Sequence, residues 1–359
     1  MIGKRLHLAR MAAGLSLRDL EQKIGNRVTA QAIGKYERDE SMPSSGVLLA
    51  LATALGVTED YLLGDASLEL EDVEFRKKDL ATKRDDAQVR ALALHLLERY
   101  LAVEQLLNLP SQDWNKPREA PYPVHDPSEA DRAARSLRQH WGLGIDPIPD
   151  LMELLEEQGI KVLALDQLGI DGLTAQVRRP DKAPAPIIAV NANDWGERQR
   201  FTLAHELGHM LLEPSADVDA EKAAHRFAGA FLMPAEALWR EIGKHRKSIG
   251  WGELFKLKAV FRVSVQALTY RCKDLGIFPY TLYRALFQEF ERRGWRHPPY
   301  EEPLAMRPQR PKRFERLCFR ALAEGAISET RAAELLGKSV WQLQQEMDEP
   351  PKEKELVSF

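Results

Sequence analysis

The stretch of sequence that decides the fold reads Arg200-Phe201-Thr202-Leu203-Ala204-His205-Glu206-Leu207-Gly208-His209. Apolar residues recur through it and no proline interrupts it, so we expect a helix. Residues four apart lie on one face of a helix, which places His205 and His209 one above the other. Two neutral imidazoles at this spacing can bind one metal ion, and Glu206 can take a proton from an attacking water. Gly208 allows another backbone to approach this face closely.

A second predicted helical stretch, residues 221–228, offers the remaining ligand. A catalytic zinc takes three protein ligands and keeps one position open. Glu221 and His225 are one helical turn apart, so both can face the same site. We predict Glu221 as the third ligand and His225 as the residue that orients one of the ligating histidines. The reverse assignment, with His225 on the metal, stays open. Zinc is the expected ion, although this donor set also accepts Mn²⁺ or Fe²⁺.

The histidine motif also has a plainer interpretation. A short H-E-x-x-H pattern arises by chance, and its histidines can belong to a buried amphipathic helix and hydrogen-bond to backbone. The second helical stretch, with Glu221 and His225 at helical spacing, favours a metal site over that interpretation.

Composition limits the class of protein. The chain has 359 residues and a net charge of -3, which allows more than one domain and excludes a global field that attracts polyanions. Its two cysteines, Cys272 and Cys318, are far apart, which predicts a reducing compartment rather than a disulfide scaffold. No stretch is apolar over the length of a membrane span, and the N-terminus lacks a long apolar segment. We therefore expect a cytoplasmic protein.

Residues 1–64 are predicted to form a separate DNA-binding domain of five short helices. Gly14 is placed to end the first helix, Ser16 to cap the second and Thr29 to cap the third. Two helices joined by a tight turn are the helix-turn-helix arrangement.

This segment resembles the lambda-repressor-like (XRE-type) helix-turn-helix family. The resemblance rests on Leu17-Arg18-Asp19-Leu20, on the run from Thr29 to Arg38, and on Leu51-Ala52 with Leu55-Gly56-Val57. It implies that the helix starting at Thr29 enters the major groove of a double-stranded DNA operator. The DNA contacts implied by this resemblance are Thr29, Ala30, Gln31 and Lys35. Asp39 departs from the family pattern, because a glycine usually ends this helix.

Two further expectations concern this domain. A single domain of this kind holds a short half-site weakly, so a homodimer on a near-palindrome is expected. The alternative is a helical bundle that docks on another protein, because residues 1–40 are only weakly basic.

Residues 65–125 are predicted to connect two domains. Charged residues dominate 65–84, which indicates a solvated linker or a frayed helix. The apolar pattern of 85–108 predicts a long helix, either a dimerisation helix or a strut against the next domain. Five prolines between 110 and 127 then predict a non-helical crossing.

Residues 126–280 are predicted to carry the metal site. Helices are expected at 126–141 and 147–158, and strands at 160–165, 172–177 and 186–191. A mostly α fold with a small α+β core follows. Residues 281–349 are expected to form a helical C-terminal extension, and 350–359 a disordered tail.

The region from 125 to 300 resembles the ImmA/IrrE family of metallo-endopeptidases. The resemblance rests on the stretch from Arg200 to His209, the run from Glu221 to Pro234, and Trp141-Gly142-Leu143-Gly144-Ile145-Asp146-Pro147-Ile148-Pro149. It implies a zincin-like fold, His205, His209 and Glu221 as ligands, and Glu206 as general base. In that family the position of His225 is more often asparagine or aspartate. Members cut transcriptional repressors, which implies a protease connected to gene control.

Two functions therefore stand against each other. The first is a zinc-dependent endopeptidase fused to its own DNA-reading domain, which cleaves a repressor-type protein or itself in a stress or mobile-element response. The second is a transcription factor or antitoxin whose metal site is sensory or structural. Glu206 argues against the second, because a structural zinc fills its fourth position with a protein ligand.

Overall fold

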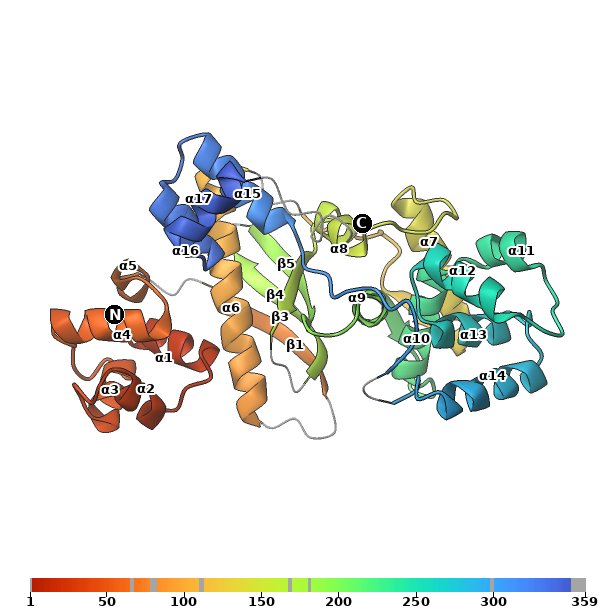
Figure 1. Cartoon of the computed structure of the whole chain (residues 1–359), viewed down its shortest axis with the longest axis horizontal. Helices are drawn as coiled ribbons and strands as arrows, with labels where there is room; N and C mark the ends of the chain where they lie inside the picture. Colours follow the sequence, from red (N-terminus) through yellow and green to blue (C-terminus); the bar gives the residue numbers. More distant parts are fainter. Residues whose placement is uncertain are drawn as a thin grey trace.

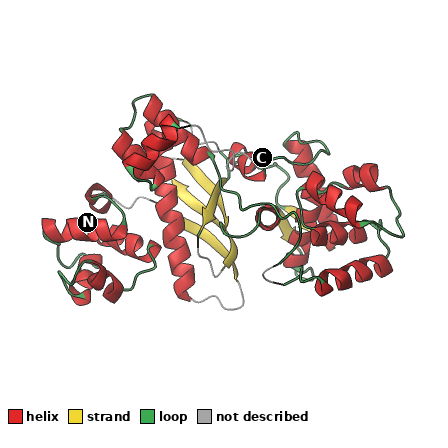
Figure 2. Ribbon diagram, in the orientation of Figure 1, coloured by secondary structure: helices red, strands yellow, loops and turns green. Residues whose placement is uncertain are grey.

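The computed structural model describes residues 2–64, 68–77, 83–109, 113–166, 170–179, 182–297 and 300–349. A helical bundle lies at one end of the molecule, a sheet at its centre and a larger group of helices at the other end (Figures 1 and 2). The fold is mostly α with a small α+β core, as the sequence predicts.

The five-helix bundle is confirmed, with helices α1 Gly3–Ala12, α2 Leu17–Lys23, α3 Ala30–Glu37, α4 Ser45–Leu55 and α5 Glu59–Leu63. Ser16 and Asp19 form a capping box on α2, and the Thr29 hydroxyl accepts a hydrogen bond from the Ala32 amide at the start of α3. The residues of its core with no exposed surface are Leu6, Leu20, Ile33, Leu51 and Leu62.

Asp39 ends α3 in the left-handed conformation that a glycine usually adopts. Its φ is +56°, and its carboxylate accepts a hydrogen bond of 2.8 Å from the Gly3 amide. A short polar side chain tolerates this conformation when it bonds locally. The departure from the family pattern therefore leaves the bundle intact.

Within the segment 65–84, for which the charges predict a linker or frayed helix, residues 69–77 are a strand, while 65–67 and 78–82 lie outside the described residues. Residues Glu69–Lys77 form strand β1, which pairs antiparallel with β4, Ile170–Arg179. Charge on both sides of a strand hides the alternation from which strands are predicted, so only the distant partner reveals it.

The long helix α6, Lys83–Leu106, is a strut. Val89, Ala93 and Leu97 pack against the sheet, while Tyr100 and Val103 pack against the C-terminal helices. Helix α1 lies against α6 on another side, where Arg5 pairs with Glu98. The strut alternative is thus observed within the chain, and the homodimer stays a proposal.

The central sheet has the strand order β1-β4-β5-β3, where β3 is Lys161–Leu165 and β5 is Lys182–Asn191. Strand β4 runs antiparallel to β5, and β3 runs parallel to β5. Alternate residues face opposite sides. Leu173, Ala175 and Ile187 face α6, whereas Ile188 and Val190 face the core that contains the histidine helix.

Helices cover the second face of the sheet and extend beyond it (Figure 1). Their bounds are α7 Ala130–His140, preceded by the 3₁₀ turn Pro127–Glu129, α8 Leu151–Glu157, α9 Gly196–Leu211, α10 Ala220–Leu232, α11 Ala235–Ile242, α12 Trp251–Phe261, α13 Val265–Asp274 and α14 Tyr280–Arg292. A short parallel pair, β2 Tyr122–Val124 and β6 Leu212–Pro214, joins the end of α9 to the proline-rich crossing.

The C-terminal extension, 281–349, is helical, as the sequence predicts. It contains most of α14 and then α15 Arg313–Ala323, α16 Glu329–Leu336 and α17 Val340–Asp348. The expected disordered tail, 350–359, lies outside the described residues. The division of the chain at residues 64, 125, 280 and 349 remains our proposal.

Among the described residues, no helix is long and apolar enough to cross a membrane. Cys272 and Cys318 are free and buried, as expected without a disulfide scaffold.

Candidate metal centre and DNA-reading face

Helix α9 carries the two histidines of the motif, and its buried side explains their orientation. Leu203, Ala204, Leu207 and Leu211 pack into the main core. Residues later in the chain fix its first turn, where Glu197 accepts hydrogen bonds from Lys258 and from the Met306 amide, at 2.5 and 2.8 Å. Because both ends of the buried face are fixed, the position of the histidines is set by the core.

Helix α10 brings Glu221 to the histidines. Asp219 caps the helix by accepting a hydrogen bond from the Lys222 amide, so Glu221 lies in the first turn. Gly208 permits the close crossing with α9, because a Cβ there would lie 3.3 Å from the Ala224 Cα and 3.1 Å from the Phe227 ring. The close backbone approach predicted at Gly208 is thus present.

Three side chains converge where the two helices cross. The Nε2 atoms of His205 and His209 are 2.9 Å apart, and each lies 3.2 Å from a carboxylate oxygen of Glu221. All the donor atoms lie within 4.8 Å of one another. His205 is fully buried, while 58% of the Glu221 side chain is exposed. The group therefore lies at the protein surface with one side open.

This geometry fits a metal ion. Donor atoms held at about 2.0–2.1 Å from one tetrahedral zinc lie roughly 3.3 Å from each other. The observed separations of 2.9 and 3.2 Å are close to that value. Two imidazole nitrogens and a carboxylate are also the donor types that such ions accept. The residues present thus suit a divalent cation.

Glu206 follows His205 in α9 and is buried, with 3% of its surface exposed. Strand β4 approaches its carboxylate: a Cβ on Gly172 would lie 2.8 Å from Glu206 Oε1 and 2.9 Å from Thr202 Cγ2. Position 172 therefore requires glycine, because any larger residue would displace the carboxylate. Sequence reasoning missed Gly172, although a glycine within a predicted strand is a known signal of close approach.

His225 lies beside the cluster, one turn along α10 from Glu221. Its ring centroid is 4.5 Å from that of His205 and 5.6 Å from that of Phe201. The second-shell role predicted for His225 is consistent with this position, and it stays a proposal.

Two other polar residues near the motif have structural contacts. Arg200 is buried and donates hydrogen bonds to the carbonyls of Ile148 and Arg262, at 2.8 and 3.2 Å. It therefore joins two loops through their backbone oxygens rather than through a carboxylate. Burial lowers the pKa of Arg200 to about 10. His140 is exposed and bonds to Asn115, so neither residue is assigned to the chemistry.

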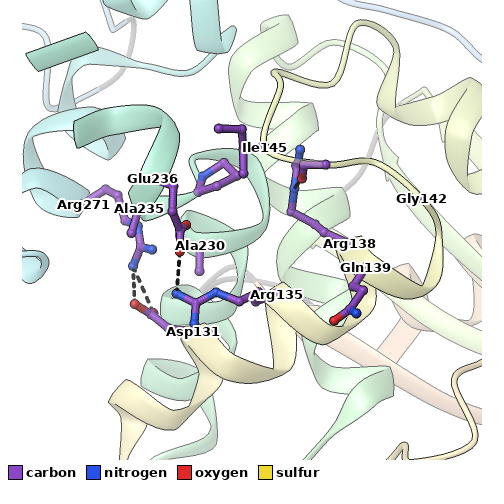
Figure 3. A pocket seen from close by; sticks show the side chains of 12 residues that line it. Asp131, Arg135, Arg138, Gln139, Gly142, Ile145, Ala230, Ala235, Glu236 and Arg271 are labelled. Carbon is purple, nitrogen blue, oxygen red and sulfur yellow. Dashed lines mark hydrogen bonds and ion pairs between the residues drawn. The ribbon is translucent and has the colours of Figure 1, made fainter. Parts of the chain in front are cut away.

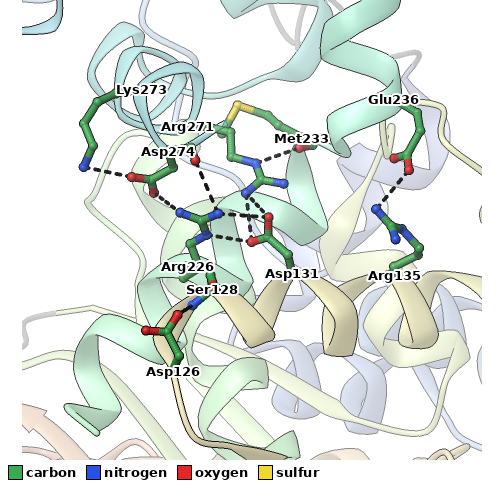
Figure 4. A network of polar contacts seen from close by, with 10 residues as sticks. All are labelled: Asp126, Ser128, Asp131, Arg135, Arg226, Met233, Glu236, Arg271, Lys273 and Asp274. Carbon is green, nitrogen blue, oxygen red and sulfur yellow. Dashed lines mark hydrogen bonds and ion pairs between the residues drawn. The ribbon is translucent and has the colours of Figure 1, made fainter. Parts of the chain in front are cut away.

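An ion-pair network fixes the outer side of α10 (Figure 4). Arg226 lies between Asp131 of α7 and Asp274 of α13, at 2.7 and 3.3 Å. Arg271 also reaches Asp131, at 2.9 Å. Because Arg226 follows His225 directly, these contacts orient the helix that presents Glu221. The sequence analysis did not single out these residues.

Two cavities flank α10. One, of 420 Å³, has Asp131, Arg138 and Glu236 in its wall (Figure 3). Its Arg138 donates to the carbonyl of Phe231, and its Arg135 forms an ion pair with Glu236. The other, of 560 Å³, opens beside His225 and Phe201 and is lined further by Trp195, Tyr270 and Tyr300. This second cavity is next to the donor group through His225, whose ring lies against that of His205.

The predicted DNA contacts lie on α3 and at its N-cap. Thr29, Gln31 and Lys35 are exposed, and Ala30 is half-buried with its amide bonded to Glu21 at 3.0 Å. The Thr29 hydroxyl is engaged as the cap of the helix. In Figure 1, α1 lies between this helix and α6. The reading face is therefore available to a partner.

Comparison with known families agrees with this arrangement. Residues 155–273 match the model of a peptidase family described as the IrrE N-terminal-like domain. Residues 6–62 match a model described as helix-turn-helix. No match was found for this chain among the curated proteins or among the solved structures.

Proposed function

Since this chain joins a DNA-binding helix-turn-helix domain to an IrrE-like peptidase domain, we propose that it is a transcriptional regulator with a metal-dependent endopeptidase activity. The observation that carries the proposal is the convergence of His205, His209 and Glu221, with the buried Glu206 next to His205 in the same helix. A purely structural metal site would need a fourth protein ligand.

Each residue has a defined part in the proposed reaction. His205, His209 and Glu221 hold the cation, which when bound lowers the pKa of water and polarises a carbonyl. Glu206 takes the proton of the attacking water and delivers it to the leaving amine. Gly172 has no side chain and so leaves the space that this buried carboxylate occupies. His225 contacts His205 and orients its ring.

The substrate class follows from the reading domain and from the family resemblance. We propose that the target is a repressor-type regulatory protein, cleaved in a stress or mobile-element response, with zinc as the metal. In a variant of this proposal the chain cleaves itself within 65–84 or 109–126. Mass spectrometry of the intact protein after zinc addition would detect the fragments.

The test is cleavage of fluorescein-labelled casein by the full chain loaded with one equivalent of zinc. Glu206→Gln should retain zinc and lower the rate by about 10²–10⁴-fold, because it removes the general base alone. Zinc content and circular dichroism of the variant control for metal loss and misfolding. Unchanged cleavage would refute the mechanism.

The second candidate is a regulator with a sensory metal site and little proteolysis. It is supported if Glu206→Gln represses a reporter as fully as the native chain and no cleavage occurs in either protein. The Glu221 side chain is 58% exposed. A metal bound there could exchange with solvent, which a sensory site requires.

A further inference from the structure

Strand β1 occupies an unusual place for a segment that follows the reading domain. It is the outermost strand of the sheet and pairs along β4 from Glu69↔Arg178 to Lys77↔Ile170. It lies outside residues 155–273, which match the peptidase family, whereas β4 lies inside them. The segment between the domains thus adds a strand to the peptidase sheet.

Strand β4 lies beside the proposed general base. Its residue Gly172 faces the Glu206 carboxylate, and Arg76 of β1 is the register partner of Gly172. Neighbouring strands lie about 4.8 Å apart. The backbone of β1 therefore runs one strand spacing from the backbone that covers Glu206.

Without β1, the N–H and C=O groups on that side of β4 would be unpaired. Such an edge accepts an extended peptide through backbone hydrogen bonds. Because β1 runs antiparallel to β4, it already makes the pairing that an added peptide strand would make.

The outer edge of β1 is a poor alternative for an incoming strand. Its register shifts between Glu71 and Glu74 and again between Arg76 and Lys77, and Asp72 has a φ of +48°. Irregularities and charges of this kind protect edges against further pairing. An extended substrate segment therefore fits the edge of β4 better than the edge of β1.

None of the described side chains of β1 is fully buried. Leu68, Leu70 and Val73 are partly buried against the core beneath α6. Its polar contacts, Glu71 with Arg178 and Asp72 with Gln176, lie at the surface. Exposed pairs contribute about 0–1 kcal/mol. An incoming strand would replace the backbone hydrogen bonds of β1 one for one.

We propose that β1 is a placeholder on the substrate-binding edge of β4, and that an extended segment of the protein substrate displaces it before cleavage. This inference rests on the proposed peptidase function. In the chain, β1 lies between the reading domain and α6, and α1 of the reading domain packs on α6. The two elements that flank β1 in the sequence are therefore in contact with each other.

A reversible disulfide tests the displacement. Glu71 and Gln176 are register partners, so Glu71→Cys with Gln176→Cys can tie β1 to β4. The matched control is Gln176→Cys with Pro186→Cys, which ties the same β4 position to β5 and leaves β1 free. The native Cys272 and Cys318 are buried and do not compete. Each protein is its own folding control, because it is compared oxidised and after reduction by a phosphine.

The readout is cleavage of fluorescein-labelled casein by the zinc-loaded chain. We expect the oxidised β1–β4 pair to cleave at least ten-fold more slowly than its reduced form, with no such change in the β4–β5 control. Equal rates in the oxidised and reduced forms of the β1–β4 pair would overturn the placeholder.

Hydrogen exchange separates this inference from the proposed activity. If no protein cleaves casein, the peptidase proposal fails, and amide exchange of the Glu206→Gln chain with excess casein decides the inference. Faster exchange in 69–77, with 172–178 still protected, supports displacement of β1. Unchanged exchange in 69–77 overturns it.

Discussion

The donor group on α9 and α10 and the proposed DNA-contact face of α3 are both carried by helices, yet they differ in burial. His205 is fully buried and Glu206 is 3% exposed, whereas Gln31 and Lys35 are exposed. A metal site needs donors that the protein core holds in place, while a DNA-reading face is completed by its partner. Changes at the donor group should therefore strongly reduce metal binding, whereas changes at α3 should only weaken DNA binding.

The largest effect is expected from Glu221→Ala. Removing the carboxylate leaves two imidazoles, so we expect zinc affinity to fall roughly a thousandfold. Competition with a chromogenic chelator measures the affinity. Glu213→Ala removes an exposed carboxylate from the neighbouring β6 and should change nothing. Wild-type zinc affinity in Glu221→Ala would remove this residue from the ligand set.

A smaller effect at the same site is expected from His225. If its ring orients His205, His225→Ala should lower zinc affinity by about 10–100-fold. His225→Asn keeps a hydrogen-bonding group and should recover most of that loss. An alanine variant with wild-type affinity would leave His225 with a packing role only.

At the reading face we expect graded losses. Gln31→Ala should cost about 1–3 kcal/mol on a duplex selected from a random pool, and should relax specificity at one position. Lys35→Ala should reduce the salt slope of binding by about 1 if it serves a phosphate. Lys4→Ala, which removes an exposed lysine from α1, is the matched control. Casein cleavage should be unaffected in all three variants.

The last prediction concerns the contact between the reading domain and α6. His95 of α6 packs edge-on against Tyr61, and burial lowers the pKa of His95 to about 4 from 6.5, helped by Arg99 and Arg5. The stabilisation from neutral His95 is complete above pH 6.5 and is lost as the pH falls toward 4. At pH 5, which lies 1.5 units below the unfolded pKa of 6.5, we expect a loss of about 2 kcal/mol.

Thermal unfolding at pH 7.5 and pH 5 measures this loss. His95→Gln cannot take a proton and should show a smaller decrease in melting temperature between the two pH values. Equal decreases in both proteins would show that other groups cause the pH dependence.

The same contrast explains which features the sequence predicts. The histidine helix, the capped helices of the bundle and the three strands 161–165, 170–179 and 182–191 follow from local periodicity and capping. Strand β1 does not, because six of its nine residues are charged and its partner lies about a hundred positions away. The contact of Gly172 with Glu206 and the network of Arg226 with Asp131 and Asp274 are likewise non-local.

By itself, the sequence determined which residues can share a helix face: His205 with His209, and Glu221 with His225, because helical spacing is a local property. Only the tertiary structure decided that Glu221 reaches both imidazoles, since this depends on how closely α9 and α10 cross at Gly208. It also decided that the segment after the reading domain becomes a strand over the edge nearest Glu206. Strand pairing is set by contacts between distant residues, and no local pattern encodes it.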